Sequence, residues 1–380
     1  MQKQTSRQRT FILLSLAHTA SGLCWIVPLF LPLIREELHL TYTQGGFLLT
    51  CYSIAFSVFI MLSGHLGDIY EARKFLSFGF LLTAATFSLL LLVQSYLRIL
   101  VVLALVAVGA SIFYPVGMAS VSRGWQKGIF FGLFEAAGCM GVLMATLLFS
   151  SLVVPLGWRL TAFIFALPSL PIGLVFLTSQ VNLKYGNATS RPRITSPGPK
   201  SLILFYLARG VQIFGGTAVM SFMPLLAVDV GGLPAEKASL FLVFVWVGGV
   251  PAALVHGILS DVCSPLRIIL VLLLITIPIV FAITLPLPLL AIFPLLIALG
   301  FCIIGAWVPQ NMWLSRVTLE KARGKVFGGT LSLVSVANIF SPVFFGFLAD
   351  TWGLVATYRL TLLPMIIAAV LLSKLAREDH

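Results

Sequence analysis

Long apolar runs follow one another along the whole chain and are separated by short polar segments. A run of about 20 residues crosses a hydrocarbon layer of roughly 30 Å as an α-helix, because each residue adds about 1.5 Å. We therefore predict an all-α membrane protein. Where prolines interrupt the apolar stretch 267–314, we place a helix boundary near Leu287. The twelve predicted transmembrane helices cover residues 11–34, 45–64, 75–94, 97–121, 128–152, 159–179, 201–227, 238–258, 267–286, 288–314, 326–347 and 354–374.

The polar segments contain one element twice, at a constant offset of 193 positions. Gly64–Asp68 ends the second predicted helix, and Gly257–Asp261 ends the eighth. The same offset carries Tyr114 onto Trp307. A constant offset over separate landmarks indicates that a whole unit was duplicated. The predicted fold is therefore two pseudo-symmetric bundles of six helices each.

The boundary between these bundles is predicted in the longest polar segment. Residues 180–200 are polar and proline-rich, a composition typical of linkers. We expect an N-terminal six-helix bundle over 1–179, a cytoplasmic linker over 180–200 and a C-terminal six-helix bundle over 201–380. With the N-terminus inside, 18 of the 24 Lys and Arg residues fall in cytoplasmic segments and five in outer loops. This imbalance predicts a multi-pass protein of the plasma (inner) membrane with both termini in the cytoplasm.

Composition excludes the main soluble classes. Hydrophobic residues make up 59% and charged residues 9%, and the mean hydropathy is +1.07. The net charge of +12 comes from basic residues scattered between apolar runs, so it does not indicate a nucleic-acid partner. The five cysteines lie in or beside apolar runs without metal-ligand spacing, and we interpret them as small core residues. No metal or cofactor is expected, and we expect a monomer in the lipid bilayer.

Several motifs resemble those of the major facilitator superfamily. They are a Gly-x-Leu-x-Asp-x5-Lys/Arg element at Gly64–Lys74 and Gly257–Arg267, Gly157–Arg159 before the sixth helix, and Ser341–Asp350 ending the eleventh. The resemblance covers nearly the whole chain. It implies the transporter fold of that superfamily, in which substrate binds near the membrane midplane between two halves.

Within the superfamily, Thr41–Gly45 and Gly109–Pro115 resemble efflux proteins of the fosmidomycin-resistance type, although Tyr114 replaces that family's histidine. Two motifs of proton-coupled drug antiporters are altered. Leu103 stands where their fourth helix has an arginine, and residues 141–146 lack the Gly-Pro-x-x-Gly-Gly pattern. The resemblance therefore favours a secondary transporter other than an ordinary multidrug antiporter.

The repeated element implies a conformational latch. A carboxylate such as Asp68 accepts hydrogen bonds from the exposed amides of a helix start, which carries partial positive charge. By the resemblance, that start belongs to the eleventh helix, in the other half. The alternative is a carboxylate that only stabilises its own loop. The predicted latch residues are Gly64, Gly67, Asp68, Arg73, Asp261 and Arg267.

Polar residues inside the predicted helices are costly in lipid and therefore informative. Five of them, His18, Tyr114, Glu135, Arg209 and Trp307, lie eight or nine residues from the nearest cytoplasmic Lys or Arg. At about 1.5 Å per residue each lies roughly 12–14 Å deep, near the midplane. Helical spacing extends this set, and the candidate substrate-binding residues are His18, Trp25, Tyr114, Arg209, Gln212, Trp307, Gln310, Asn311 and Asn338.

Each candidate has an alternative role. His18, Gln310, Asn311 and Asn338 could instead hydrogen-bond between helices, and the aromatic residues Tyr114 and Trp307 could serve packing. Arg209 is a fixed cation, so we expect it to contact an anionic part of the substrate. Glu135 is the one acidic residue deep within a predicted helix, where a carboxyl is neutral unless water or a cation approaches. We predict Glu135 as the coupling proton site, with His18 as the rival.

These features predict a secondary transporter that moves a small organic solute by alternating access, with proton-coupled export (an efflux antiporter) as the first hypothesis. Uptake or exchange of a small organic anion is the alternative. A receptor or assembly factor on the same fold is a third, of another class. An enzyme is excluded by the lack of a nucleophile–base pair, a metal-ligand cluster and a phosphate loop in the sequence.

Overall fold

The computed structural model describes residues 2–125, 127–179, 199–317 and 323–378, and within them the side chains of 2–6, 68, 199, 323–334 and 378 are not described. The linker predicted at 180–200 therefore lies almost entirely outside the described residues. Helices make up nearly all of the described chain, and no strand occurs in it. The prediction of an all-α protein is confirmed.

The helices of the first half are α1 (Gln2–Leu23), α2 (Val27–Leu38), α3 (Tyr42–Ile69), α4 (Ala72–Ser88) with the short η1 (Leu89–Leu92), α5 (Tyr96–Gly124), α6 (Gly128–Ala166) and α7 (Ser169–Thr178). Those of the second half are α8 (Pro199–Asp229), η2 (Ala235–Lys237), α9 (Ser239–Val262), α10 (Pro265–Ile283), α11 (Leu289–Ile303), α12 (Trp307–Val317), α13 (Arg323–Trp352), α14 (Leu354–Leu360) and α15 (Leu362–Glu378).

Ten described segments are long and apolar enough to cross a membrane. One of them, Gly128–Thr178, has 51 residues and contains the fifth and sixth predicted helices. These two are separated by a kink at Gly157, whose φ of 73° lies in the left-handed region that favours glycine. Helix α13 covers the eleventh predicted helix. The arrangement fits twelve transmembrane helices.

Two predicted helices are broken near their middle. The first divides into α1 and α2 at residues 24–26, and the tenth into α11 and α12 at residues 304–306. A proline follows each break, at Pro28 and Pro309. Proline has no amide hydrogen and clashes with the carbonyl four residues earlier, which here belongs to Cys24 or Gly305. The helical spacing by which Trp25 was added to the candidates after His18 therefore does not hold, because Trp25 lies in the first break.

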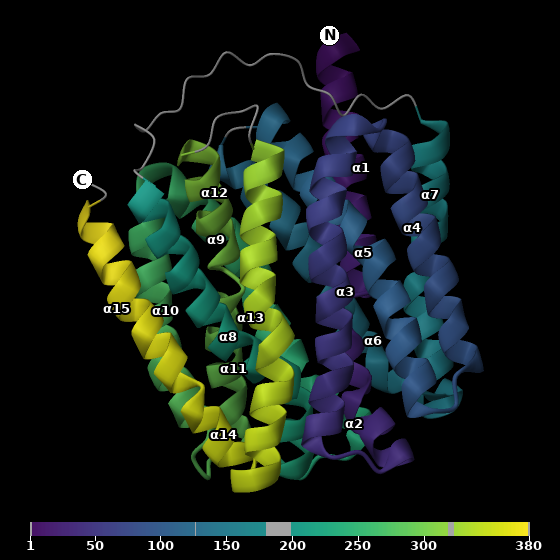
Figure 1. The fold of residues 1–380 in the computed structure, drawn as a ribbon, viewed down its shortest axis with the longest axis vertical. Helices are drawn as coiled ribbons and strands as arrows, with labels where there is room; N and C mark the ends of the chain where they lie inside the picture. The colour runs from purple at the N-terminus through teal and green to yellow at the C-terminus, as the bar shows by residue number, and fades with distance from the viewer. Residues whose placement is uncertain (1, 126, 180–198, 318–322, 379–380) are drawn as a thin grey trace.

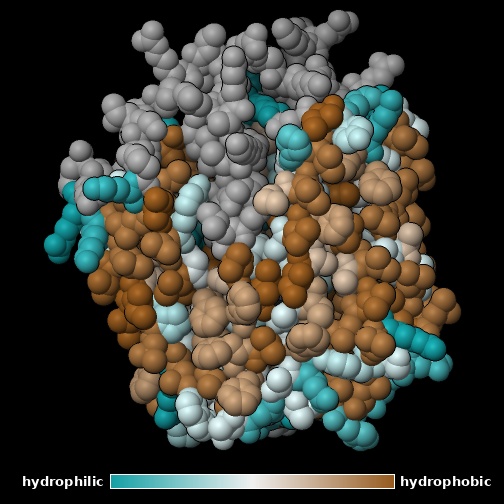
Figure 2. Space-filling model, in the orientation of Figure 1, coloured by the Kyte–Doolittle hydropathy of each residue, from teal (hydrophilic) through white to brown (hydrophobic). Residues whose placement is uncertain are grey.

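The helices run roughly side by side, and both ends of the described chain lie toward the same end of the molecule (Figure 1). Following the predicted orientation, we call this the inner end and the opposite one, with α2 and α14, the outer end. Apolar side chains cover the middle of the face in Figure 2, and polar ones gather at its lower rim. This belt is the surface expected against lipid.

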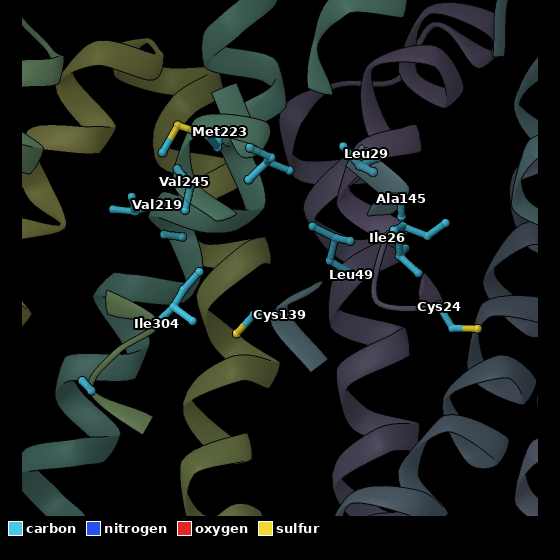
Figure 3. Close-up of a cluster of buried hydrophobic side chains, with 14 of the residues drawn as sticks. Cys24, Ile26, Leu29, Leu49, Cys139, Ala145, Val219, Met223, Val245 and Ile304 are labelled. Carbon is cyan, nitrogen blue, oxygen red and sulfur yellow. The ribbon is translucent and has the colours of Figure 1, made fainter. Parts of the chain in front are cut away.

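The two halves meet along two helix pairs, α3 with α13 and α6 with α9. Glycines allow the backbones to touch. A Cβ on Gly46 would lie 2.3 Å from the carbonyl oxygen of Pro342, and one on Gly128 would lie 2.3 Å from that of Gly257. In the close-up, Ile26 and Leu49 of the first half lie on one side, and Val219 and Ile304 of the second half lie on the other (Figure 3).

Candidate functional site: a central cavity with two gates

A cavity of about 280 Å³ lies between the two halves. The break between α1 and α2, the break between α11 and α12, and helices α3, α8, α9 and α13 contribute to its wall. Most of the lining is apolar or aromatic. Of the predicted substrate-binding residues, five line it: Trp25, Arg209, Gln212, Trp307 and Asn338.

Arg209 on α8 contributes a buried positive charge to this wall, with only 2% of its surface exposed. Its Nε donates to Oε1 of Gln310 at 2.5 Å, and its Nη1 donates to Oε1 of Gln212 at 2.5 Å. The guanidinium lies 5.7 Å from the ring centre of Trp307. Both hydrogen-bond acceptors are neutral, and no described carboxylate lies within 4.0 Å. Because a buried charge is costly unless it is paired, this arrangement favours an anionic ligand.

Glu135 on α6 lies outside the cavity lining, at a buried contact between the halves. Its Oε1 accepts a hydrogen bond of 2.6 Å from the hydroxyl of Tyr114 and one of 3.1 Å from Nδ2 of Asn311. Asn311 also donates to Tyr114 at 3.0 Å. Three predicted site residues are thereby brought together, from α5, α6 and α12. Asn311 follows Gln310 on α12, so one helix turn contacts both Arg209 and Glu135.

His18 on α1 packs inside the first half rather than along the cavity. Its Nδ1 lies 2.8 Å from the carbonyl oxygen of Phe134, and its ring stacks on that of Phe134 with centres 4.3 Å apart. A Cβ on Gly138 would lie 2.5 Å from its Nε2, so this glycine makes room for the imidazole. The geometry is that of a residue joining α1 to α6.

The cavity also contains residues that the sequence did not single out. Thr217 on α8 donates to Oδ1 of Asn338 on α13. It lies eight residues after Arg209, so extending the polar stripe of α8 by two turns would have found it. Tyr52 and Phe56 on α3 also line the cavity, but apolar runs contain many aromatic residues and gave no signal for these two.

At the inner end, the described latch contact between the halves is made by Asp261 of the second half. Oδ1 of Asp261 accepts a hydrogen bond of 2.8 Å from the amide of Gly128, at the start of α6. This is the type of contact expected of Asp68, whose side chain lies outside the described residues, as does the segment 318–322 before α13. Arg73 instead contacts Glu71 at 2.6 Å and the carbonyl of Ser179, within its own half.

The remaining described latch residues lie near helix ends. Gly64 and Gly67 are in the last turns of α3, and a Cβ on Gly67 would lie 2.7 Å from Cγ2 of Val116 on α5. Gly67 therefore permits packing within the first half. Arg267 is in the first turn of α10.

At the outer end, carboxylates from the second half contact the start of α3. Asp350 accepts hydrogen bonds from the amides of Tyr42 at 2.9 Å and Thr43 at 2.8 Å, and from the Thr43 hydroxyl at 2.5 Å. Partial burial would raise the pKa of Asp350, but these hydrogen bonds outweigh it and hold the pKa below its usual value. The group is therefore an anion at neutral pH.

A second carboxylate reinforces this closure. Asp229, the last residue of α8, accepts from Nη1 of Arg35 at 2.8 Å and from the hydroxyl of Tyr42 at 2.5 Å. The Arg35 guanidinium lies 4.0 Å from the Tyr42 ring centre. The sequence placed Asp229 and Asp350 at outer helix ends, but nothing in the repeat pointed to partners in the other half.

The Gly157–Arg159 motif has a structural role at the same end. Arg159 forms two hydrogen bonds to the Glu37 carboxylate, at 3.0 and 2.7 Å, and Nε1 of Trp158 donates to it at 2.8 Å. These bonds hold the end of α2 against the kink in α6.

Comparison with known proteins identifies the family. A sequence profile of the Major Facilitator Superfamily matches residues 11–328 and, separately, residues 205–380. The chain belongs to this superfamily. It is 23% identical over 374 residues to the uncharacterised MFS-type transporter YfnC of Bacillus subtilis, covering 93% of this chain and 90% of that protein. It is 26% identical to the fosmidomycin resistance protein of Escherichia coli over 261 residues, covering 64% of this chain and 63% of that protein.

The fold agrees with this membership. The crystal structure of a bacterial homologue of the human lysosomal transporter Spinster, in an inward-facing and occupied conformation, superimposes with a TM-score of 0.76. Its identity is 17%, and the match covers 98% of this chain and 97% of that one. The predicted fold class is confirmed, and so is the sequence resemblance to proteins of the fosmidomycin-resistance type. Membership of this transporter family also confirms the prediction that the chain is not an enzyme. The protein is a multi-pass membrane transporter of small solutes.

Proposed function

We propose that this superfamily member exports a small organic solute in exchange for protons, by alternating access to the central cavity. It acts as a monomer in the plasma membrane, with both termini in the cytoplasm as the distribution of Lys and Arg predicts. The halves 1–179 and 201–380 move relative to one another, and the linker 180–200 joins them. The name of the Escherichia coli relative, a resistance protein, supports export.

The observation that carries this proposal is the position of α12 between Arg209 and Glu135, which are ionisable residues of opposite halves. Gln310 accepts from Arg209 at the cavity wall, and the next residue, Asn311, donates to Glu135 in the other half. The break before Trp307 separates this turn from α11, so α12 can tilt by itself. A movement at the proton site therefore reaches the substrate site through one short helix.

Glu135 is suited to exchange a proton. Both of its hydrogen bonds end on Oε1, so Oε2 has no protein partner in the described part of the chain. The side chain keeps 9% of its surface exposed. A carboxylate accepts hydrogen bonds more strongly than a neutral carboxyl does, so protonation weakens the contact between Glu135 and Asn311. In our proposal this releases α12 and the inner contact between the halves.

The gates alternate with this step. In the structure the outer contacts of Asp350 and Asp229 and the inner contact of Asp261 are formed together. In our proposal the outer contacts break when the outer end opens, and those of Asp261 and Asp68 break when the inner end opens. Each gate joins a carboxylate of one half to a helix start of the other, so neither is a substrate ligand. His18 is the second candidate for the proton, and its packing against Phe134 supports the structural alternative.

Uptake or exchange of an organic anion is the second candidate function. It is favoured by the unpaired charge of Arg209 together with the altered antiporter motifs at Leu103 and 141–146. Flux in purified proteoliposomes separates both transport functions from a receptor or assembly factor, which would give none.

The test begins with a screen of growth with and without the gene, over fosmidomycin and a panel of small anionic metabolites and antibiotics. The compound found is then followed in inverted membrane vesicles under an imposed proton gradient. We expect Glu135→Gln to abolish accumulation against the gradient while leaving substrate exchange, which moves no net proton, largely intact. Glu36→Gln, at an exposed carboxylate near the outer end, is the matched control.

If Glu135→Gln still concentrates the compound against its gradient, the coupling proton binds elsewhere, and His18→Gln is tested next. Accumulation in right-side-out rather than inverted vesicles would reverse the direction and support uptake.

A further inference from the structure

We infer that the cavity binds an elongated amphipathic anion, with one acidic head group at Arg209, an aromatic or aliphatic body, and a neutral hydrogen-bonding group at the far end. This inference rests on the proposed function, because it specifies the class of solute that the same cavity carries.

The head group is assigned by the unused donors of Arg209. A guanidinium has five N–H donors, and the neighbouring amides of Gln212 and Gln310 accept from Nη1 and Nε. Nη2 has no acceptor among the described residues. The two glutamines hold the guanidinium in place without neutralising it, because an amide oxygen carries no net charge. A carboxylate or phosphonate satisfies both the free donors and the charge.

The rest of the lining limits the ligand to one charge. Among the described residues of the cavity wall, Arg209 is the single charged side chain. A second anionic group or a cationic group would therefore lie in an apolar wall without a counter-charge, which is unfavourable in a low dielectric. The solute is a monoanion rather than a dianion or a zwitterion.

The body is assigned by the aromatic wall. Trp25 and Phe56 meet edge to face with ring centres 5.6 Å apart, and Tyr52 stacks on Phe56 at 6.0 Å. Trp246 and Trp307 line the opposite half of the cavity. Nearly half of the surface of Trp25 remains exposed, so this ring is available to a ligand. Apolar and aromatic surfaces of this kind gain free energy by covering an apolar body.

The far end is assigned by a neutral polar cluster. Thr217 lies eight residues beyond Arg209 on α8, which is roughly 12 Å along the helix axis. Thr217 uses its hydroxyl hydrogen to reach Oδ1 of Asn338, and the amide Nδ2 of Asn338 has no acceptor in the described chain. Ser335 and Ser221 lie one turn away on the same two helices, and both line the cavity. A hydroxyl, carbonyl or amide group of the solute fits there.

Binding of a matched probe series to purified protein tests each of these assignments. The reference probe is 4-(4-hydroxyphenyl)butanoate, and titration calorimetry is combined with quenching of tryptophan fluorescence. Three relatives test these features in turn: 4-(4-hydroxyphenyl)butan-1-ol has no charge, 4-phenylbutanoate has no far hydroxyl, and acetate has neither the body nor the far hydroxyl. For the wild type we expect each to bind at least roughly tenfold more weakly than the reference probe.

The variants assign each preference to a residue. Arg209→Gln should remove the preference for the acid over the alcohol, and Asn338→Ala should remove the preference for the hydroxylated probe while keeping that for the acid. Arg98→Gln, at an exposed arginine near the outer end, should change neither. An unchanged elution volume in gel filtration shows that a variant that has lost binding is still folded.

Equal binding of the acid and the alcohol to the wild type overturns the inference, and so does acetate or nitrate competing as strongly as the reference probe. Binding is measured without a proton gradient. Retained coupling in Glu135→Gln therefore contradicts the proposed export mechanism but not this substrate class, and failure of the probe series contradicts the substrate class but not the coupling.

Discussion

Replacing Asp350 by asparagine should open the outer gate. The carboxylate accepts three hydrogen bonds from the first residues of α3, at Tyr42 and Thr43, across the boundary between the halves. Asparagine keeps one acceptor oxygen, but it presents an amide donor where the second oxygen accepted and it removes the negative charge at a helix start. The loss of one net hydrogen bond costs about 1 kcal/mol, and the charge–dipole interaction adds about 0.3–1 kcal/mol.

A change of about 1–2 kcal/mol shifts a two-state equilibrium by roughly 5- to 30-fold. The assay is labelling of a single reporter cysteine, Ser57→Cys in the cavity wall, after replacement of the five native cysteines. An impermeant maleimide is added to one membrane face at a time. Asp350→Asn should raise the labelling rate from the outer face by the same factor, and Glu36→Gln should not change it.

The pH dependence of this gate follows from the sign of the pKa shift. Hydrogen bonds hold the pKa of Asp350 below its usual value. The carboxylate and its contact are therefore fully present at any pH above the usual pKa. They are lost only as the pH falls through the lowered pKa. The labelling rate, divided by that of a free thiol at the same pH because maleimide reacts with the thiolate, should therefore be constant between about pH 5 and 8 in a Glu135→Gln background. An unchanged labelling rate in a folded Asp350→Asn protein would refute the role of this contact as a gate.

Three further predictions concern the inner end and the cavity. Asp68→Asn and Asp261→Asn should each preserve folding but slow turnover by a few-fold, since an amide interacts with a helix start more weakly than a carboxylate; wild-type flux in either would remove its latch role. Arg209→Lys should weaken binding of the anionic probe by roughly tenfold despite conserving the charge, because lysine lacks the planar fork; equal affinity by calorimetry would contradict this. Gly128→Ala should separate α6 from α9 at the inner end, where its Cβ would lie 2.3 Å from a carbonyl oxygen, and faster labelling from the inner face would show it.

The sequence predicted the fold because the bilayer imposes a simple rule. Only a helix of sufficient length satisfies its backbone in hydrocarbon, so the apolar runs located the helices to within a few residues. The breaks at residues 24–26 and 304–306 were missed although Pro28 and Pro309 signal them. Prolines also lie inside α5, α8 and α13, which continue as helices, so a proline by itself does not predict a break.

Counting residues from the cytoplasmic end of each helix predicted part of the candidate site. The count gives a residue's position along the helix axis, but it does not give the direction in which the side chain points around that axis. Arg209 and Trp307, which were counted to the same depth, both face the cavity. His18 has the same depth, yet its ring lies against Phe134 within the first half. Contacts with neighbouring helices decide which way a side chain points, and a single sequence does not reveal these contacts.

The two helix breaks explain why the binding site need not follow the symmetry of the duplication. The offset of 193 positions pairs Trp307 with Tyr114, but Tyr114 lies on the unbroken α5 and Trp307 begins the short α12. Consequently Tyr114 reaches Glu135 on the neighbouring helix, whereas Trp307 stands beside Arg209 at the cavity wall. The duplicated scaffold supplies equivalent depths in both halves. The break in one copy turns one of these positions toward the cavity, and the intact helix in the other holds its counterpart against Glu135, the proposed proton site.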